Sequence, residues 1–130
     1  MLFRSRGGEQ PEEQLIGLLA AAGRGPARDG VFALWLVLRA AEALLTPQPR
    51  PVSSRGHRRR LQALETRLAS LALPGPLKRA LAAARQHLEP GTPAAAAVVL
   101  SQLVAPARDV LGPEAGNVVA VAARTARIHL

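Results

Sequence analysis

The 130-residue sequence contains no cysteine and no tyrosine, and its aromatic residues are two phenylalanines and one tryptophan. Without cysteine, the chain has no disulfide bond, no thiolate nucleophile and no cysteine-ligated zinc or iron–sulfur site. Three histidines and two aspartates leave few groups for catalysis. No phosphate-binding loop, HExxH motif or catalytic pair of carboxylates is recognisable. The sequence therefore predicts a non-enzymatic protein with no catalytic residues, no cofactor and no metal.

Long hydrophobic runs are also scarce. The longest covers residues 31–38 and stops at Arg39. Even if it is extended to Leu45, it spans about 15 residues, fewer than the roughly 20 that cross a bilayer, so we expect no membrane span. Basic residues near the N-terminus are soon followed by glutamates, which argues against a secretory signal or a transit peptide. We expect a cytoplasmic protein, with residues 1–9 as a candidate for disorder.

Alanine and leucine are the most frequent residues, with 26 and 21 copies, and 48% of the chain is hydrophobic. This content is too high for a chain that is disordered throughout. Both residues are strong helix formers, whereas the aromatic and β-branched residues that favour strands are few. The length fits one domain. The sequence therefore predicts a single all-α domain over residues 1–130.

Proline and glycine mark the ends of the predicted helices. The first helix covers 11–22 and has a proline and two glutamates in its first turn. The second begins with Asp29 as its N-cap and ends near Leu45. Alternating prolines follow, and they remove backbone N–H donors. We therefore predict a proline-rich basic loop at 46–56.

Leucine spacing predicts the next two helices. The third helix ends at Pro74 and has leucines at spacings of three and four: Leu61, Leu64, Leu68 and Leu71. The fourth has a similar apolar face: Leu77, Leu81, Ala84 and Leu88. Only a tight turn separates the two, so they should form an antiparallel hairpin.

Two further helices complete the predicted fold. The fifth begins at Thr92, and Pro106 should kink or end it near Val104 unless its last turn resumes through Leu111. The sixth has one apolar face: Val118, Val121, Thr125 and Ile128. We predict a compact bundle of about five to six helices, with a short stack of helical hairpins as the alternative.

Positive charge is concentrated in one part of the chain. The formal net charge is +8, and residues 46–89 hold nine basic side chains against two glutamates. Eight of these form the candidate site for an anion or an acidic partner: Arg55, Arg58, Arg59, Arg60, Arg67, Lys78, Arg79 and Arg85. Backbone N–H groups at a helix start, together with guanidiniums, suit phosphate or carboxylate. The alternative is a solvated basic surface that keeps an alanine- and leucine-rich protein soluble.

Trp35 and Arg39 lie one helical turn apart and are a second candidate. Tryptophan and arginine dominate binding hot spots, so this pair is a possible interface anchor. The alternative is a buried tryptophan with Arg39 folded over it.

These observations predict an interaction module, an adaptor or a complex subunit. It would bind an acidic protein partner through an apolar helical groove and the basic hairpin. The alternative is sequence-independent binding of DNA or RNA through the arginines of residues 50–85, which would imply a nuclear or nucleoid location. A third possibility is a homo-oligomer formed through an exposed alanine- and leucine-rich face.

Overall fold

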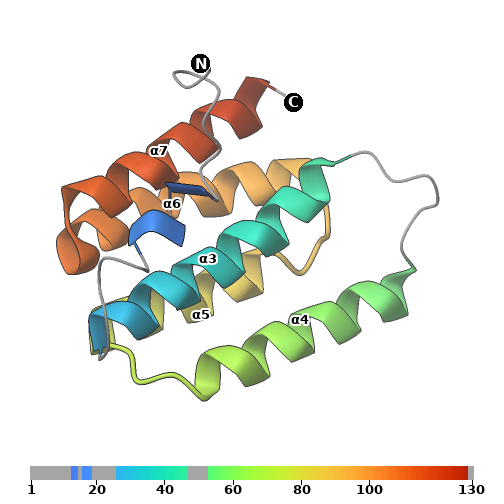
Figure 1. The fold of residues 1–130 in the computed structure, drawn as a ribbon. Helices are drawn as coiled ribbons and strands as arrows, with labels where there is room; N and C mark the ends of the chain where they lie inside the picture. The colour runs from blue at the N-terminus through green and yellow to red at the C-terminus, as the bar shows by residue number, and fades with distance from the viewer. Residues whose placement is uncertain (1–12, 15, 19–25, 47–52, 129–130) are drawn as a thin grey trace.

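The computed structural model describes residues 13–14, 16–18, 26–46 and 53–128, which form an all-α bundle (Figure 1). Of the predicted first helix, the described residues are helical, and the others lie outside the described chain. The predicted disorder at 1–9 also lies outside it.

Five helices follow one another in the described chain. They are α3 (Pro26–Leu45), α4 (Ser54–Ala69), α5 (Gly75–His87), α6 (Pro93–Leu111) and α7 (Pro113–Ile128). Helix α6 contacts α3, α5 and α7, whereas α4 packs only against α3 and α5 among these helices. Figure 1 shows α4 at one edge of the bundle and α7 at the opposite edge. The arrangement confirms the predicted all-α bundle of about five to six helices.

Leucine fills the centre of the bundle. Leu34 of α3, Leu77 and Leu81 of α5, and Leu100 of α6 are almost completely buried. Each such side chain contributes roughly 1.5–3 kcal/mol by leaving water. No polar or charged residue of the described chain is classed as buried. The described charges therefore lie at the surface or at its edge.

Helix α3 begins earlier than predicted. It starts at Pro26, so Asp29 lies in its first turn and is not the N-cap. A proline is favoured at this position because the first N–H groups of a helix have no partner within the helix. The Asp29 carboxylate instead accepts a hydrogen bond from the Ala72 backbone N–H at 3.0 Å. Asp29 thus holds the turn between α4 and α5 against the start of α3.

Helix α4 differs from the prediction at both ends. The proposed loop at 46–56 is too long, because α4 begins at Ser54. The Ser53 hydroxyl oxygen accepts from the Gly56 N–H at 3.0 Å and caps the helix. The helix ends at Ala69 rather than near Pro74, and the Ser70 hydroxyl donates to the Arg67 carbonyl oxygen. The rest of the predicted loop, residues 47–52, lies outside the described chain.

Helix α6 continues through Pro106 to Leu111, so its last turn does resume. The predicted apolar face of α7 is not the buried face of the helix: Val118 is buried, but Thr125 is exposed and Ile128 is 82% exposed. Small residues form the buried face instead, including Ala115, Gly116, Ala122, Ala123 and Ala126. A Cβ atom on Gly116 would lie 2.6 Å from Arg108 Cβ. The small side chains allow α7 to approach α6 closely.

Candidate functional site

Helix α4 carries most of the predicted basic residues. Its buried side, formed by Leu61, Leu64 and Leu68, faces α3 and α5. Its other positions are mostly exposed, and five of them are arginines: Arg55, Arg58, Arg59, Arg60 and Arg67. Glu65 is the helix's single acidic residue. The three leucines therefore hold a strongly positive surface against the edge of the bundle.

His57 attaches the start of α4 to the turn between α5 and α6. Its Nε2 donates a hydrogen bond to the Leu88 carbonyl oxygen at 2.9 Å. Gly91 has a φ of +70°, and a Cβ atom there would lie 3.1 Å from His57 Nε2. No local sequence pattern indicates this contact, because the two hydrogen-bonded residues are 31 positions apart.

Two aromatic side chains lie between α3 and α4. The rings of Phe32 and Trp35 are stacked, with centroids 5.6 Å apart, and both are half-buried. The Arg39 guanidinium carbon lies 5.1 Å from the Trp35 ring centroid, and that of Arg67 lies 5.4 Å from the Phe32 ring centroid. Both distances are within the range of cation–π attraction. One arginine from each helix therefore lies over the aromatic pair.

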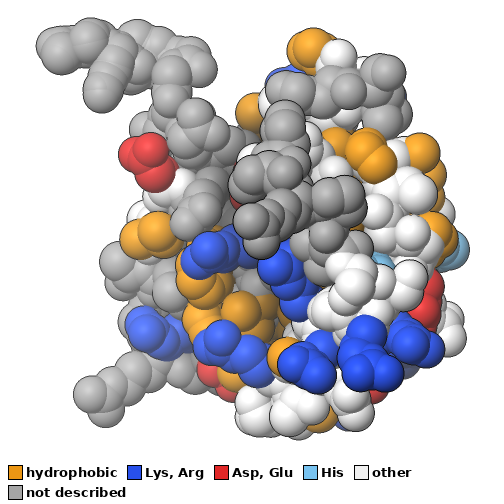
Figure 2. All heavy atoms as spheres, turned by 90° about the vertical axis from the view of Figure 1, so that its right-hand side faces the viewer, with side chains coloured by type: hydrophobic (Ala, Val, Ile, Leu, Met, Phe, Trp, Pro, Cys, Tyr) orange, Lys and Arg blue, Asp and Glu red, His pale blue; other side chains and the backbone are white. Residues whose placement is uncertain are grey.

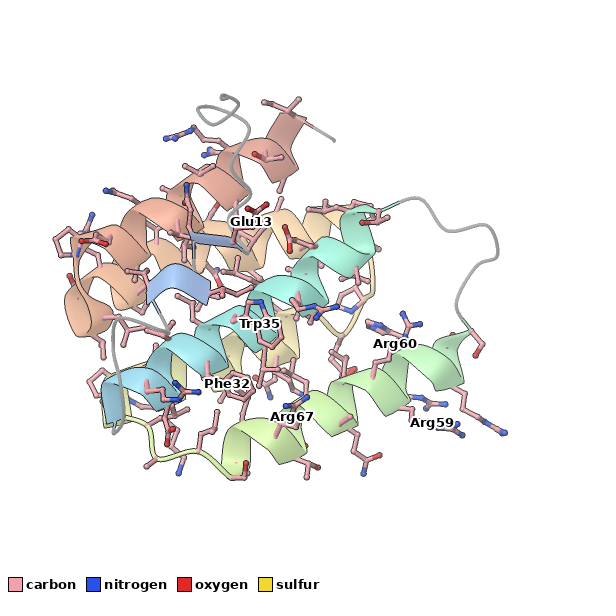
Figure 3. All side chains as sticks on the ribbon, in the orientation of Figure 1. Glu13, Phe32, Trp35, Arg59, Arg60 and Arg67 are labelled. Atoms are coloured by element: carbon pink, nitrogen blue, oxygen red, sulfur yellow. The ribbon has the colours of Figure 1, made fainter. Side chains whose placement is uncertain are left out.

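Arg60 lies on the same side of α4 as Arg67. The two are seven residues apart, which places them two turns apart on one face. Arg60 also lines a small cavity of about 50 Å³ together with Ala40 and Leu44 of α3. Figure 3 shows Arg60, Arg67, Phe32 and Trp35 between α3 and α4. We call Phe32, Trp35, Arg39, Arg60 and Arg67 the arginine–aromatic strip.

The fold thus brings together two sets of residues that the sequence proposed separately. Trp35 and Arg39 are the predicted interface anchor on α3, and Arg60 and Arg67 belong to the predicted basic site. Arg59 lies outside the strip, on the side of α4 that points away from α3 (Figure 3). Arg39, Arg60 and Arg67 are exposed, so a partner can reach them from solvent.

A larger hollow opens at the end of the strip. It has a volume of about 540 Å³, and its lining includes Leu44 of α3 and His57, Arg58 and Arg60 of α4. Glu89 lies at the same hollow. In Figure 2, which views the bundle from this end, basic side chains surround an exposed hydrophobic area.

A second groove lies on the other side of α4, against α5. It has a volume of about 150 Å³, and its lining includes Leu68, Leu73 and Leu81 as well as Lys78 and Arg85. Lys78 and Arg85, which are seven residues apart, both lie at this groove. Arg79 is exposed but does not line this groove.

The cations beside this second groove are partly neutralised. Arg85 Nη1 donates to Glu89 at 3.0 Å, and Arg85 Nε lies 3.8 Å from a Glu65 carboxylate oxygen. In the strip, by contrast, Arg39, Arg60 and Arg67 form no salt bridge with any described residue. The two sides of α4 therefore differ in the positive charge that is free to meet a partner.

Two buried nitrogen atoms of the described residues, Trp35 Nε1 and Arg85 Nε, lack a hydrogen-bond partner. An unsatisfied buried donor costs about 1–3 kcal/mol. Both lie where α4 meets a neighbouring helix. The contacts that hold α4 in place are therefore less complete than those of the bundle's centre.

Metal and membrane criteria give two further findings. Among the described residues, no three of histidine, cysteine, aspartate and glutamate converge on one point.

Helix α6 is the one helix in the described ranges that is long and apolar enough to cross a bilayer. A helix at the core of a bundle meets the same criteria, and 33% of the residues in this apolar window are buried. Helix α3, which contains the hydrophobic run at 31–38, does not meet these criteria.

No known protein family, curated protein or solved structure matches the chain.

Proposed function

We propose that the chain is a non-enzymatic interaction module, an adaptor or a complex subunit, that docks an acidic surface of a protein partner on its basic α4–α5 hairpin. One observation carries the proposal: exposed cations gather on these two helices with few acidic neighbours. Arg55, Arg58, Arg59, Lys78 and Arg79 form no salt bridge within the described chain. Such a surface attracts acidic partners and speeds their association.

Apolar surface beside the cations supports a protein partner in particular. The α4–α5 groove offers leucine side chains, and the arginine–aromatic strip offers half-buried rings. Protein interfaces combine an apolar centre with a polar rim, and arginine and aromatic residues are enriched in them. Nucleic acid would place its phosphates against the same arginines. However, Phe32 and Trp35 are stacked on each other and each has an arginine over its ring, whereas a stacked base needs an open ring face.

The test compares two kinds of acidic probe. Fluorescence anisotropy would follow a labelled glutamate-rich peptide and labelled single- and double-stranded oligonucleotides, each titrated with the protein at several salt concentrations. The combined variant Arg58→Ala, Arg59→Ala and Arg60→Ala removes three hairpin charges. Its matched control, Arg108→Ala, Arg124→Ala and Arg127→Ala, removes the same charge from α6 and α7, where these arginines are exposed.

We expect the peptide to bind, and the hairpin variant to lose binding while the control variant keeps most of it. Helicity should be unchanged in both, by circular dichroism. If the two variants lose peptide binding equally, binding depends on net charge alone, and the proposal is overturned. Tight binding of oligonucleotides with a steep salt dependence, and none of the peptide, would overturn it in favour of phosphate-backbone binding.

A further inference from the structure

We infer that the arginine–aromatic strip is the docking site for an acidic amphipathic helix of the partner protein. The carboxylates of that helix would lie seven residues apart, with apolar side chains between them. The inference rests on the proposed function and specifies which side of α4 the partner contacts and what form its binding segment has.

Charge pairing selects the strip over the α4–α5 groove. Arg85 of the groove already has two glutamate partners, and Glu65 would repel an incoming carboxylate. In the strip, Arg39, Arg60 and Arg67 are exposed and have no acidic partner in the described structure. A carboxylate that approaches the strip gains pairing without breaking an existing ion pair.

The aromatic rings also hold two of the arginines in place. Arg39 lies over Trp35 and Arg67 lies over Phe32, at 5.1 and 5.4 Å. A guanidinium stacked on a ring keeps its N–H groups directed outward from its edge, where a carboxylate binds in a bidentate manner. Because these side chains are already ordered, less conformational entropy is lost when the partner binds.

The spacing of the arginines identifies a helix as the partner segment. Arg60 and Arg67 are seven residues apart on α4, which corresponds to about 10.5 Å along the helix axis. On a partner helix that lies along α4, residues i and i+7 share one face at the same spacing. In an extended strand, residues on one face are about 6.6 or 13 Å apart, so neither spacing matches.

The surface between the two arginines is apolar. Phe32 and Trp35 are only half-buried there, so part of each residue is open to solvent. On the partner helix, residues i+3 and i+4 fall between the two carboxylates and on the same face. Apolar side chains at those positions would cover the rings, in the helix-in-groove manner of recognition.

Two synthetic peptides test this geometry. Both are alanine-based, helical and free of tryptophan, with leucine at positions i+3 and i+4. One has glutamates at i and i+7, and its isomer has the second glutamate at i+5, on the opposite face. Trp35 is the sole tryptophan of the protein, so its emission reports directly on binding at the strip. We expect the i, i+7 peptide to shift this emission and to bind about tenfold more tightly than its isomer.

A matched pair of variants locates the site on the protein. Arg67→Gln removes a strip charge, and Arg59→Gln removes an equal charge from the outer side of the same helix. Both arginines are exposed, so both variants should fold, as circular dichroism would verify. We expect Arg67→Gln to weaken binding about tenfold and Arg59→Gln about twofold, because the outer charge acts only through a screened field.

The possible results separate this inference from the proposed function. If the two peptides bind with equal affinity and the two variants lose equal affinity, the strip is not the docking site. The proposed binding of an acidic partner would still stand. If neither peptide binds at low salt, both the docking site at the strip and the proposed acidic partner are overturned. Preference for the i, i+7 peptide together with selective loss in Arg67→Gln would support both.

Discussion

At the scale of single residues, the attachment of α4 depends on a small number of contacts between distant parts of the chain. His57 donates to the Leu88 carbonyl oxygen, and Asp29 accepts from the Ala72 N–H. The first contact fixes the start of α4 and the second fixes the turn after it. Between these two points, three buried leucines hold the helix. The positions of Arg60 and Arg67 along α4 are therefore set by contacts that other residues of the helix and its flanking turns make.

Replacing Gly91 tests the first of these contacts. Gly91 has a φ of +70°, and a Cβ atom there would crowd the His57 ring. We expect Gly91→Ala to lower the free energy of unfolding by about 1–2 kcal/mol, because alanine is strained in a left-handed conformation. Denaturant unfolding followed by circular dichroism measures this change.

The matched control is Gly75→Ala at the start of α5. Gly75 has no positive φ, and the nearest atom to a Cβ there is the flexible end of Arg79 at 3.4 Å. The control should change stability by less than about 1 kcal/mol. Similar losses in both variants would mean that the turn at Gly91 has no special role.

Sequence reasoning found the charged residues but could not find what holds them. The clustering of arginines follows directly from counting along the chain. The contacts of Asp29 and His57 join residues 43 and 31 positions apart, and no local pattern reports such a pairing. The local signal at Asp29 instead suggested an N-cap.

At the scale of the helix, α4 has charges that oppose its own dipole. No acidic residue lies in its first turn, and Arg55 occupies that turn. A helix N-terminus carries partial positive charge, so cations there are unfavourable. The clustered arginines nearby add mutual repulsion. This arrangement costs stability, which is the kind of cost that the proposed binding role would explain.

Replacing Arg55 tests the cost. Arg55→Glu should raise the free energy of unfolding by about 0.3–1 kcal/mol, because a carboxylate at this position interacts favourably with the dipole. It would also pair with Arg59, one turn along the helix. Thermal unfolding at low ionic strength measures the gain, and Arg55→Gln, which only removes the charge, should give a smaller one. A loss of stability in Arg55→Glu would mean that the Arg55 guanidinium makes a structural contact.

Helices differed in how well their faces could be predicted. In α5, the leucines at 77 and 81 stand out from their neighbours, and the predicted face is the buried one. In α7, alanine occurs on several faces, and the apolar face predicted from the larger residues is not the buried one. Close contact with α6 buries the small residues instead, because Gly116 lies directly against Arg108. The size of the apolar side chains predicts which face of a helix is buried only where the neighbouring helix is not packed as closely as α6 is against α7.

At the scale of the whole molecule, the candidate site exists only because α3 and α4 pack against each other. Trp35 and Arg39 belong to one helix, and Arg60 and Arg67 to another. The sequence identified both sets but could not place them together, since no pattern states which side of α4 faces α3. The described cations outnumber the carboxylates around them, and most of them form no ion pair.

This excess of like charge predicts how salt changes stability. With a formal net charge of +8 and few ion pairs, repulsion among the cations should destabilise the folded state more than ion pairing stabilises it. Raising sodium chloride shortens the screening length from about 10 Å at 0.1 M to about 3 Å at 1 M. The melting temperature should therefore rise with salt.

The combined variant Arg58→Ala, Arg59→Ala and Arg60→Ala locates the source of this repulsion. If it arises mainly on α4, the variant should melt at a higher temperature than the natural chain at low salt and show a weaker salt dependence. Thermal unfolding of both chains over the same salt series would show this as curves that converge at high salt. If the melting temperature of the natural chain instead falls with salt, ion pairs dominate its electrostatics. The cations of α4 would then be paired within the protein and would not be free to bind an acidic helix.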